Sequence, residues 1–108
     1  MTSTEPSHWP TAEHEDLFAT IASLRGPDEV QQFLRDLCTR TELDAMSHRW
    51  QMARLLNEGL PYLEVAKRTH ASTTTVTRVA QWLRNGEGGY RLALSRRAPS
   101  RRPRAKRA

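Results

Sequence analysis

Apolar residues recur at helical spacing in several short segments of this chain, and this periodicity constrains the fold more than any other feature. The clearest case is the run Val30, Phe33, Leu34, Leu37 and Cys38. A spacing of three and four residues defines one buried face of an α-helix. No segment of useful length alternates apolar and polar residues as a β-strand does. The sequence therefore predicts an all-α fold with about five to six helices per chain.

Helix-capping and helix-breaking residues divide the body of the chain into consecutive segments. The first helix is expected to have its N-cap at Thr11 and to stop at Gly26, and the second to start at Pro27. The third is expected to run from Thr39 to a stop at Gly59, and the fourth to start with Pro61 as its first helical residue. The last is expected from about Thr73 to Asn85, with Ser72 as N-cap. We expect a flexible N-terminus (1–10), one helical domain (11–94) and a disordered basic tail (95–108). The stripe on residues 30–38 is expected to be core.

The third expected helix has a wider apolar surface than one buried face requires. Its apolar positions are Leu43, Met46, Trp50, Ala53, Leu55 and Leu56, and Arg49 interrupts them. A chain of 108 residues, 37% of them hydrophobic, encloses only a modest core by itself. We therefore infer a homodimer in which these helices pack between subunits, with a monomeric bundle as the alternative.

Cysteine and apolar content indicate the compartment. Cys38 is the single cysteine, which excludes an internal disulfide, and we expect it to be a small buried hydrophobe. The N-terminal residues have neither a basic start nor a long apolar run, and no stretch approaches the roughly 20 apolar residues of a membrane span. The prediction is a soluble, cytoplasmic protein.

The net charge of +5 is distributed unevenly along the chain. Residues 91–108 hold eight of the 17 basic residues and no acidic one, so the basic pI belongs to the tail. Residues 1–44 have three basic and nine acidic side chains, whereas residues 45–90 have six and three. Residues 1–44 are therefore not expected to bind a polyanion, whereas the charge of residues 45–90 is suited to binding one.

Two short helices joined by a tight turn, at about residues 61–85, predict a helix-turn-helix. The two helices of such a motif touch closely, which requires a small residue in the first and branched apolar residues on the inner face of the second. Ala66, Val76 and Val79 meet this requirement.

The outer side of the second helix then presents short polar side chains. We expect DNA contacts from Thr73, Thr74, Thr75, Thr77, Gln81 and Arg84, with Ser72, Lys67 and Arg68 nearer the DNA backbone. Threonine offers a hydroxyl to a base edge or phosphate and a methyl group to the thymine methyl. The N–H groups at the helix start also suit a phosphate. Threonines that are merely solvated are the alternative.

Residues 34–90 resemble the Trp repressor superfamily, most closely its YerC/YecD, Trp repressor-related branch. The resemblance rests on LCTRTEL (37–43), RW (49–50), LLNEG (55–59), ASTTTVTR (71–78) and GEGGY (86–90). It implies an intertwined helical homodimer that binds operator DNA through two helix-turn-helix units, with half-sites about one helical turn apart.

The resemblance also implies a vestigial site for a tryptophan corepressor. Thr39, Arg49 and Arg78 match ligand-binding positions of the family. However, Val79 replaces a glycine beside the indole and Trp82 replaces a serine near the ligand amino group. Both changes add bulk, and Trp82 itself is a candidate to fill the pocket, so we expect no tryptophan corepressor. The retained arginines are alternatively ion pairs of the dimer interface.

Two further features concern the turn and the tail. His70 stands where the family usually has glycine, at a position expected to have positive φ, at a cost on the order of 1 kcal/mol. The tail is expected to add non-specific phosphate contacts through Arg96, Arg97, Arg101, Arg102, Arg104, Lys106 and Arg107. A purely solubilising tail is the alternative, and no apolar anchor accompanies these charges for a membrane role.

Catalysis and metal binding are not expected. The four histidines are scattered, with no cysteine pair or histidine–carboxylate spacing suited to a metal. GEGG follows a helix and does not open one after a strand, unlike phosphate-binding loops. We therefore predict a sequence-specific DNA-binding transcriptional regulator that acts as a repressor. The alternative is a helical protein-interaction module with acidic residues 1–44 as its contact surface.

Overall fold

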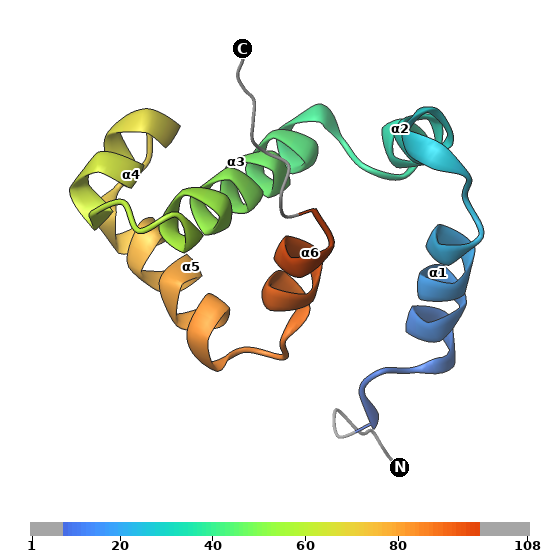
Figure 1. Cartoon of the computed structure of the whole chain (residues 1–108). Coiled ribbons are helices and arrows are strands. Elements are labelled where there is room, and N and C mark those ends of the chain that lie inside the picture. Colours follow the sequence, from blue (N-terminus) through green and yellow to red (C-terminus); the bar gives the residue numbers. More distant parts are fainter. Residues whose placement is uncertain (1–7, 98–108) are drawn as a thin grey trace. The chain divides into compact units, whose positions relative to one another are not determined.

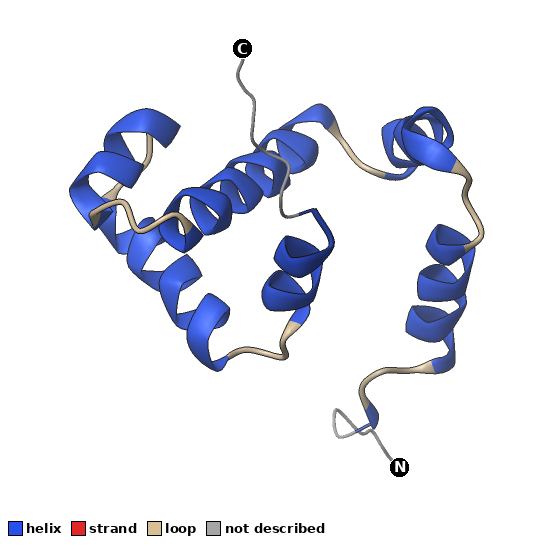
Figure 2. Cartoon of the chain, in the orientation of Figure 1, coloured by secondary structure: helices blue, strands red, loops and turns tan. Residues whose placement is uncertain are grey.

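The computed structural model of the chain describes residues 8–97, and α-helices make up most of this part (Figures 1 and 2). The helices are α1 (Ala12–Ala22), α2 (Gly26–Leu37), α3 (Arg40–Asn57), α4 (Tyr62–Thr69), α5 (Thr73–Asn85) and α6 (Gly89–Arg97). No strand occurs between residues 8 and 97. The all-α prediction is confirmed.

The helices separate into two compact units. The first unit ends at Arg40 and contains α1 and α2, and the second starts at Thr41 and contains nearly all of α3 together with α4, α5 and α6. The second unit thus contains α4 and α5, the two helices of the expected helix-turn-helix.

The first unit begins with a capped helix. The Oγ1 of Thr11 accepts the backbone N–H of His14 at 3.3 Å, and the Nδ1 of His14 accepts the backbone N–H of Thr11 at 3.0 Å. This is a capping box in which an imidazole takes the place usually held by a glutamate or glutamine. The His14 ring also lies beside Trp9, with ring centroids 5.1 Å apart. The predicted N-cap at Thr11 is confirmed.

The end of α1 differs from the sequence-based prediction. The helix ends at Ala22 because Ser23 satisfies its last carbonyls, with the Ser23 N–H on Ala19 O at 3.1 Å and the Ser23 Oγ on Thr20 O at 2.6 Å. Gly26, the predicted stop of α1, instead starts α2 with a φ of +78°.

Neither helix of the first unit buries a side chain fully. Within the stripe expected to be core, Leu37 is 50% exposed, and Val30, Phe33, Leu34 and Cys38 are half-buried. The expectation of a buried Cys38 and a core stripe is therefore wrong for a single chain. Two short helices have too little surface to enclose such a stripe.

The second unit has a closely packed core from three helices. Its buried side chains are Met52 and Ala53 of α3, Val65 and Ala66 of α4, and Val76 and Val79 of α5. Trp50, Leu55 and Leu56 pack around them. Figure 1 shows how the C-terminal part of α3 meets α4 and α5. The predicted contact of Ala66 with Val76 and Val79 is thus part of the core.

Three details of this unit differ from the sequence-based predictions. Met52 is 2% exposed although the expected apolar positions of α3 do not include it; it lies one helical turn before Leu55 and Leu56, on the side of α3 that packs in the core. Pro61 is the N-cap of α4, one residue before the helix, and is not its first helical residue. The predicted tail begins at Ser95, but α6 extends to Arg97, with the Ser95 Oγ on Leu92 O at 2.7 Å.

Candidate nucleic-acid interface

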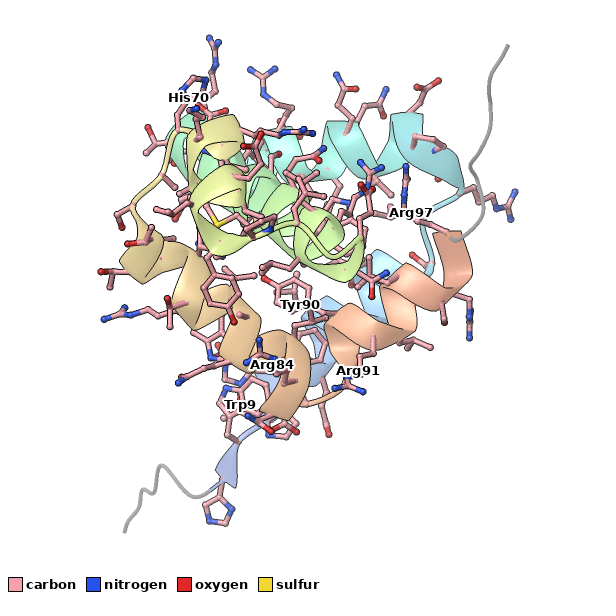
Figure 3. All side chains as sticks on the ribbon, turned by 60° about the vertical axis from the view of Figure 1, so that its left-hand side comes forward. Trp9, His70, Arg84, Tyr90, Arg91 and Arg97 are labelled. Atoms are coloured by element: carbon pink, nitrogen blue, oxygen red, sulfur yellow. The ribbon has the colours of Figure 1, made fainter. Side chains whose placement is uncertain are left out.

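A three-residue turn joins α4 to α5. The N–H of His70 bonds to Lys67 O at 3.4 Å and the N–H of Ala71 to Ala66 O at 2.9 Å, the pattern of a Schellman motif. His70 takes the left-handed conformation that this motif requires, with φ 55° and ψ 43°. Figure 3 shows His70 at this turn. The expected positive φ at residue 70 is confirmed.

The same motif closes α3 with a different residue. The N–H of Gly59 bonds to Leu56 O at 3.0 Å and the N–H of Leu60 to Leu55 O at 3.3 Å, and Gly59 has a φ of +93°. At this turn glycine takes the left-handed conformation without the crowding of a Cβ. The two turns have like geometry and differ in the residue at the left-handed position.

The N-terminus of α5 is capped and has no acidic side chain in its first turn. The Oγ of Ser72 accepts the N–H of Thr75 at 3.2 Å and lies 3.1 Å from the Thr75 Oγ1. The remaining N–H groups of the first turn lie at the positive end of the helix dipole. This helix start is thus electrostatically suited to an anion.

The four threonines of α5 do not share one environment. Thr73, Thr74 and Thr77 are exposed, whereas Thr75 is half-buried beside Ser72. The Oγ1 of Thr77 donates to Thr73 O at 2.8 Å, so its hydroxyl already has a backbone partner. Thr73 and Thr74 are consequently the threonines that combine exposure with a place in the first turn of α5.

The expected cations of α4 differ in their surroundings. Arg68 donates from Nε to the Glu64 Oε2 at 2.8 Å, and this hydrogen bond lowers the pKa of the Glu64 carboxyl. Lys67, one residue earlier, is exposed. Both cations lie in the last turn of α4, next to the turn that leads into α5.

Arg84 has an internal partner. It donates to the Tyr62 hydroxyl and lies over the Tyr62 ring, with the guanidinium carbon 5.9 Å from the ring centroid. This contact joins the end of α5 to the start of α4. Gln81, one turn earlier on α5, is exposed. The structure therefore brings the expected DNA-contact residues onto one helix-turn-helix, but it uses Arg84 to hold the two helices together.

The residues assigned to a vestigial ligand site lie in varied surroundings. Thr39 and Arg78 are exposed and Arg49 is half-buried. Trp82 is 50% exposed, while Val79 is fully buried in the core.

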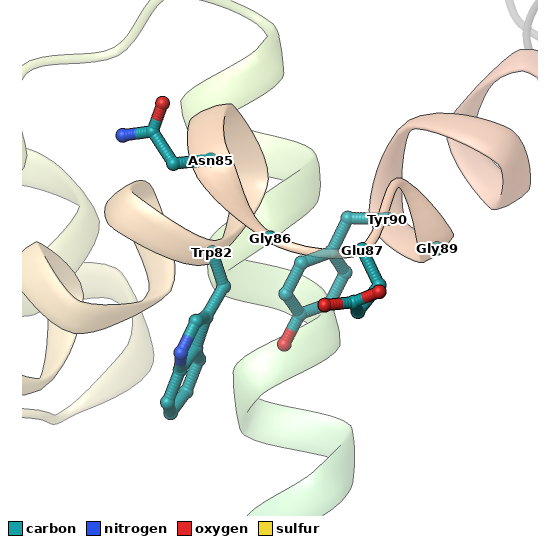
Figure 4. Close-up of a pocket in the computed structure, with 6 residues that line it drawn as sticks. All are labelled: Trp82, Asn85, Gly86, Glu87, Gly89 and Tyr90. Atoms are coloured by element: carbon teal, nitrogen blue, oxygen red, sulfur yellow. The ribbon is translucent and has the colours of Figure 1, made fainter.

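Trp82 lines an open pocket of about 610 Å³ at the junction of α5 and α6. The other lining residues are Asn85, Gly86, Glu87, Gly89 and Tyr90 (Figure 4). Figure 4 shows the rings of Trp82 and Tyr90 at this junction. Of the expected ligand residues, only Trp82 lines this pocket.

Two residues at the start of α6, Tyr90 and Arg91, make contacts that the sequence analysis does not predict. The Tyr90 ring stacks on Trp50 of α3, with centroids 6.4 Å apart at 17°. Arg91 donates from Nε to Leu83 O at 2.9 Å and from Nη2 to Arg84 O at 3.3 Å. The sequence pattern of GEGGY indicates only a helix stop, and no signal within it predicts these contacts.

Two negative findings apply to residues 8–97. No group of three or more histidine, cysteine or acidic side chains is arranged to hold a metal ion there. None of the helices in this part of the chain is long and apolar enough to cross a bilayer.

A helical fold with α4 and α5 as its helix-turn-helix places the protein in a known class. The model of the family described as Trp repressor protein matches residues 12–98, and the chain belongs to this family.

Individual relatives are similar over most of their length. The uncharacterized protein YerC of Bacillus subtilis is 39% identical over 84 residues, which cover 78% of this chain and 81% of YerC. A TrpR-like protein from Eubacterium eligens has a solved structure with a TM-score of 0.77 and 39% identity, covering 81% of this chain and 90% of that one. The crystal structure of a candidate Trp repressor from Staphylococcus aureus has a TM-score of 0.78 and 33% sequence identity. The match covers 87% of this chain and 94% of that one.

Proposed function

We propose that the protein is a sequence-specific DNA-binding transcriptional regulator, a repressor, that acts as a homodimer through α4 and α5. The observation that carries this proposal is the outer surface of α5. It presents short exposed polar side chains, Thr73, Thr74 and Gln81, on a helix whose inner face is fixed in the core by Val76 and Val79. A rigid helix with short polar side chains can approach base edges in the major groove closely.

The charges near this helix favour a phosphate backbone. Lys67 and Arg68 end α4, and the first turn of α5 contains no acid. The N–H groups of that turn and the two cations are suited to positioning contacts, while Thr74 and Gln81 are suited to base edges. Ser72, Thr75 and Thr77 then support the helix start, since each already has a hydrogen bond within the chain.

The proposed dimer is supported by apolar surface that the chain leaves uncovered. Phe18 is 47% exposed, Leu37 is 50% exposed, and no side chain of α1 or α2 is buried. Amphipathic helices of this kind become stable when another surface covers their apolar face. A twofold dimer would place two copies of α5 about one turn of DNA apart.

The proposed regulator works without a tryptophan corepressor. Val79, which takes the place of a glycine of the family, is fully buried and contributes to the core, so its volume belongs to the fold. Trp82 adds an indole beside Tyr90 at the α5–α6 junction. Calorimetric titration is expected to show no binding of tryptophan at micromolar concentration, and binding in that range would overturn this part of the proposal.

Thr74→Glu is the direct test of the DNA-reading face. Selection from a random duplex pool first defines the sequence preferred by the wild-type protein. A bulky acid at residue 74 should cost at least the roughly 1 to 3 kcal/mol of one specific contact. The measurement is a mobility shift with the selected duplex and with a random duplex.

The control for this test is Gln51→Glu. Gln51 is exposed and belongs to α3, which is not part of the proposed reading helix, so the same acidic group there should leave the preference intact. Retention of sequence preference by Thr74→Glu would show that the proposed face is wrong. A wild-type protein that selects no duplex would favour a protein-interaction module.

The basic C-terminus is proposed to add non-specific affinity. Arg96 and Arg97 are exposed at the end of α6, and Arg101, Arg102, Arg104, Lys106 and Arg107 lie outside the described residues. Deletion of residues 98–108 removes these five cations and should reduce the salt-dependence slope by up to about 4.5 per chain while preserving operator preference. Equal slopes for both proteins would contradict this role.

A further inference from the structure

The C-terminal end of α5 is held by donors from outside the helix. A helix leaves its last four carbonyl groups without partners inside it. Here the N–H of Gly86 donates to Trp82 O at 2.9 Å. The Arg91 guanidinium donates to the next two carbonyls, Leu83 O at 2.9 Å and Arg84 O at 3.3 Å. Three consecutive carbonyls are thus satisfied, and the cation lies at the negative end of the helix dipole.

The backbone between α5 and α6 is shaped for this contact. A Cβ at Gly86 would lie 2.5 Å from Trp82 O, which no side chain tolerates. Gly88 has a φ of +89°, a conformation that glycine adopts most readily. The two glycines reverse the chain within a few residues, so that Arg91 in the first turn of α6 reaches back to α5.

The neighbouring residue anchors this turn to the core. Tyr90 is half-buried, packs against the core cluster and stacks on Trp50 of α3. Arg91 therefore extends from a fixed backbone. Figure 3 shows Tyr90, Arg84 and Arg91 near the junction of α5 and α6. Through Tyr90 and Arg91, the end of α5 is tied to the same long helix against which its start is packed.

We propose that Arg91 is a positioning residue of the DNA-reading helix: it fixes the direction of α5 by binding Leu83 O and Arg84 O, and it is not one of the phosphate contacts. This role rests on the proposed function. The planar guanidinium reaches both carbonyls from two nitrogens, and a lysine ammonium has no such fork.

The test uses Arg91→Gln and Arg91→Lys, with Lys67→Gln as the matched control. Affinity for the duplex that the wild-type protein selects from a random pool is measured over a range of salt concentrations. Both Arg91 variants should bind about fivefold more weakly, and their salt-dependence slopes should equal that of the wild type. Lys67→Gln should lower the slope by about 0.9 for each phosphate that Lys67 neutralises in the wild-type protein.

A second measurement follows the helix end without DNA. Hydrogen exchange of the amides of Leu83, Arg84 and Asn85 reports fraying of the last turn of α5. Both Arg91 variants should exchange these amides about fivefold faster, while amides near Val76 keep their wild-type rates.

Each outcome decides the proposal. A reduced slope in Arg91→Gln that Arg91→Lys restores would make Arg91 a phosphate contact and overturn the positioning role. Unchanged affinity in a folded Arg91→Lys, even with faster exchange, would limit Arg91 to stability and also overturn it. A wild-type protein that selects no duplex refutes the proposed function, and with it any role of Arg91 in DNA reading.

Discussion

The two units of this chain satisfy their apolar side chains in different ways. From Thr41 onward, α3, α4 and α5 enclose a core in which Met52, Val65, Val76 and Val79 are at most 2% exposed. Up to Arg40, α1 and α2 carry apolar stripes of similar spacing and bury none of them fully. The comparison teaches that the same helical periodicity marks a buried core face in one unit and a partly exposed face in the other.

The largest effect is expected from a charge on the stripe of α2. Phe33→Asp should prevent dimer formation, because it removes a half-buried phenyl group that the proposed dimer would bury, and loss of such a group costs about 3 to 5 kcal/mol in each of two chains. Sedimentation equilibrium and the concentration dependence of Tm measure this change. The control is Gln31→Asp on the exposed side of α2, which should leave the dimer intact. If the wild-type protein is monomeric at all concentrations, the apolar stripe of α2 does not form a dimer interface and this prediction is wrong.

A smaller effect is expected at the turn of the second unit. His70→Gly should raise Tm by about 3 °C, because relief of the left-handed conformation exceeds the entropy that glycine adds to the unfolded chain. Thermal unfolding followed by circular dichroism measures the change. His70→Ala is the control: it retains a Cβ at the same φ of 55° and should bring no gain. A lower or unchanged Tm in His70→Gly would contradict the strain argument.

The smallest effect is expected at the surface pair of α4. The hydrogen bond from Arg68 lowers the pKa of Glu64, so the stabilisation is present above the ordinary pKa of a glutamate and is lost as pH falls through the lowered value. Arg68→Ala should raise the Glu64 pKa, because the hydrogen bond from Arg68 is the largest cause that lowers it. A carboxyl titration by NMR measures the shift, with Glu58, outside this pair, as internal reference. An unchanged Glu64 pKa would mean that the pair does not persist in solution.

Local patterns predict the helices of this chain well, and contacts between distant residues less well. The bounds of α5, its cap Ser72 and the buried Val76 and Val79 follow from residues that are neighbours in sequence. Periodicity does not rank the many apolar residues of the long helix α3: Met52, one turn before Leu55 and Leu56, is buried, whereas Met46 is 38% exposed.

The candidate interface shows the same division. The helix-turn-helix and its exposed Thr73 and Thr74 are predictable from spacing. The Arg84–Tyr62 contact spans 22 residues, and the Arg91 contacts depend on how two glycines reverse the chain. Such contacts depend on tertiary geometry, and no pattern within a single helix encodes them.

The core of the second unit also has a consequence for folding rates. Among the described residues, its buried apolar side chains lie within the single stretch from Met52 to Ala80, so formation of this core closes only loops within that stretch. Chains with such local contacts fold in microseconds to milliseconds, whereas assembly of two chains depends on concentration and is slower. For the proposed dimer, the helix-turn-helix of each chain is therefore expected to form first, and encounter of two chains is expected to limit the rate of assembly.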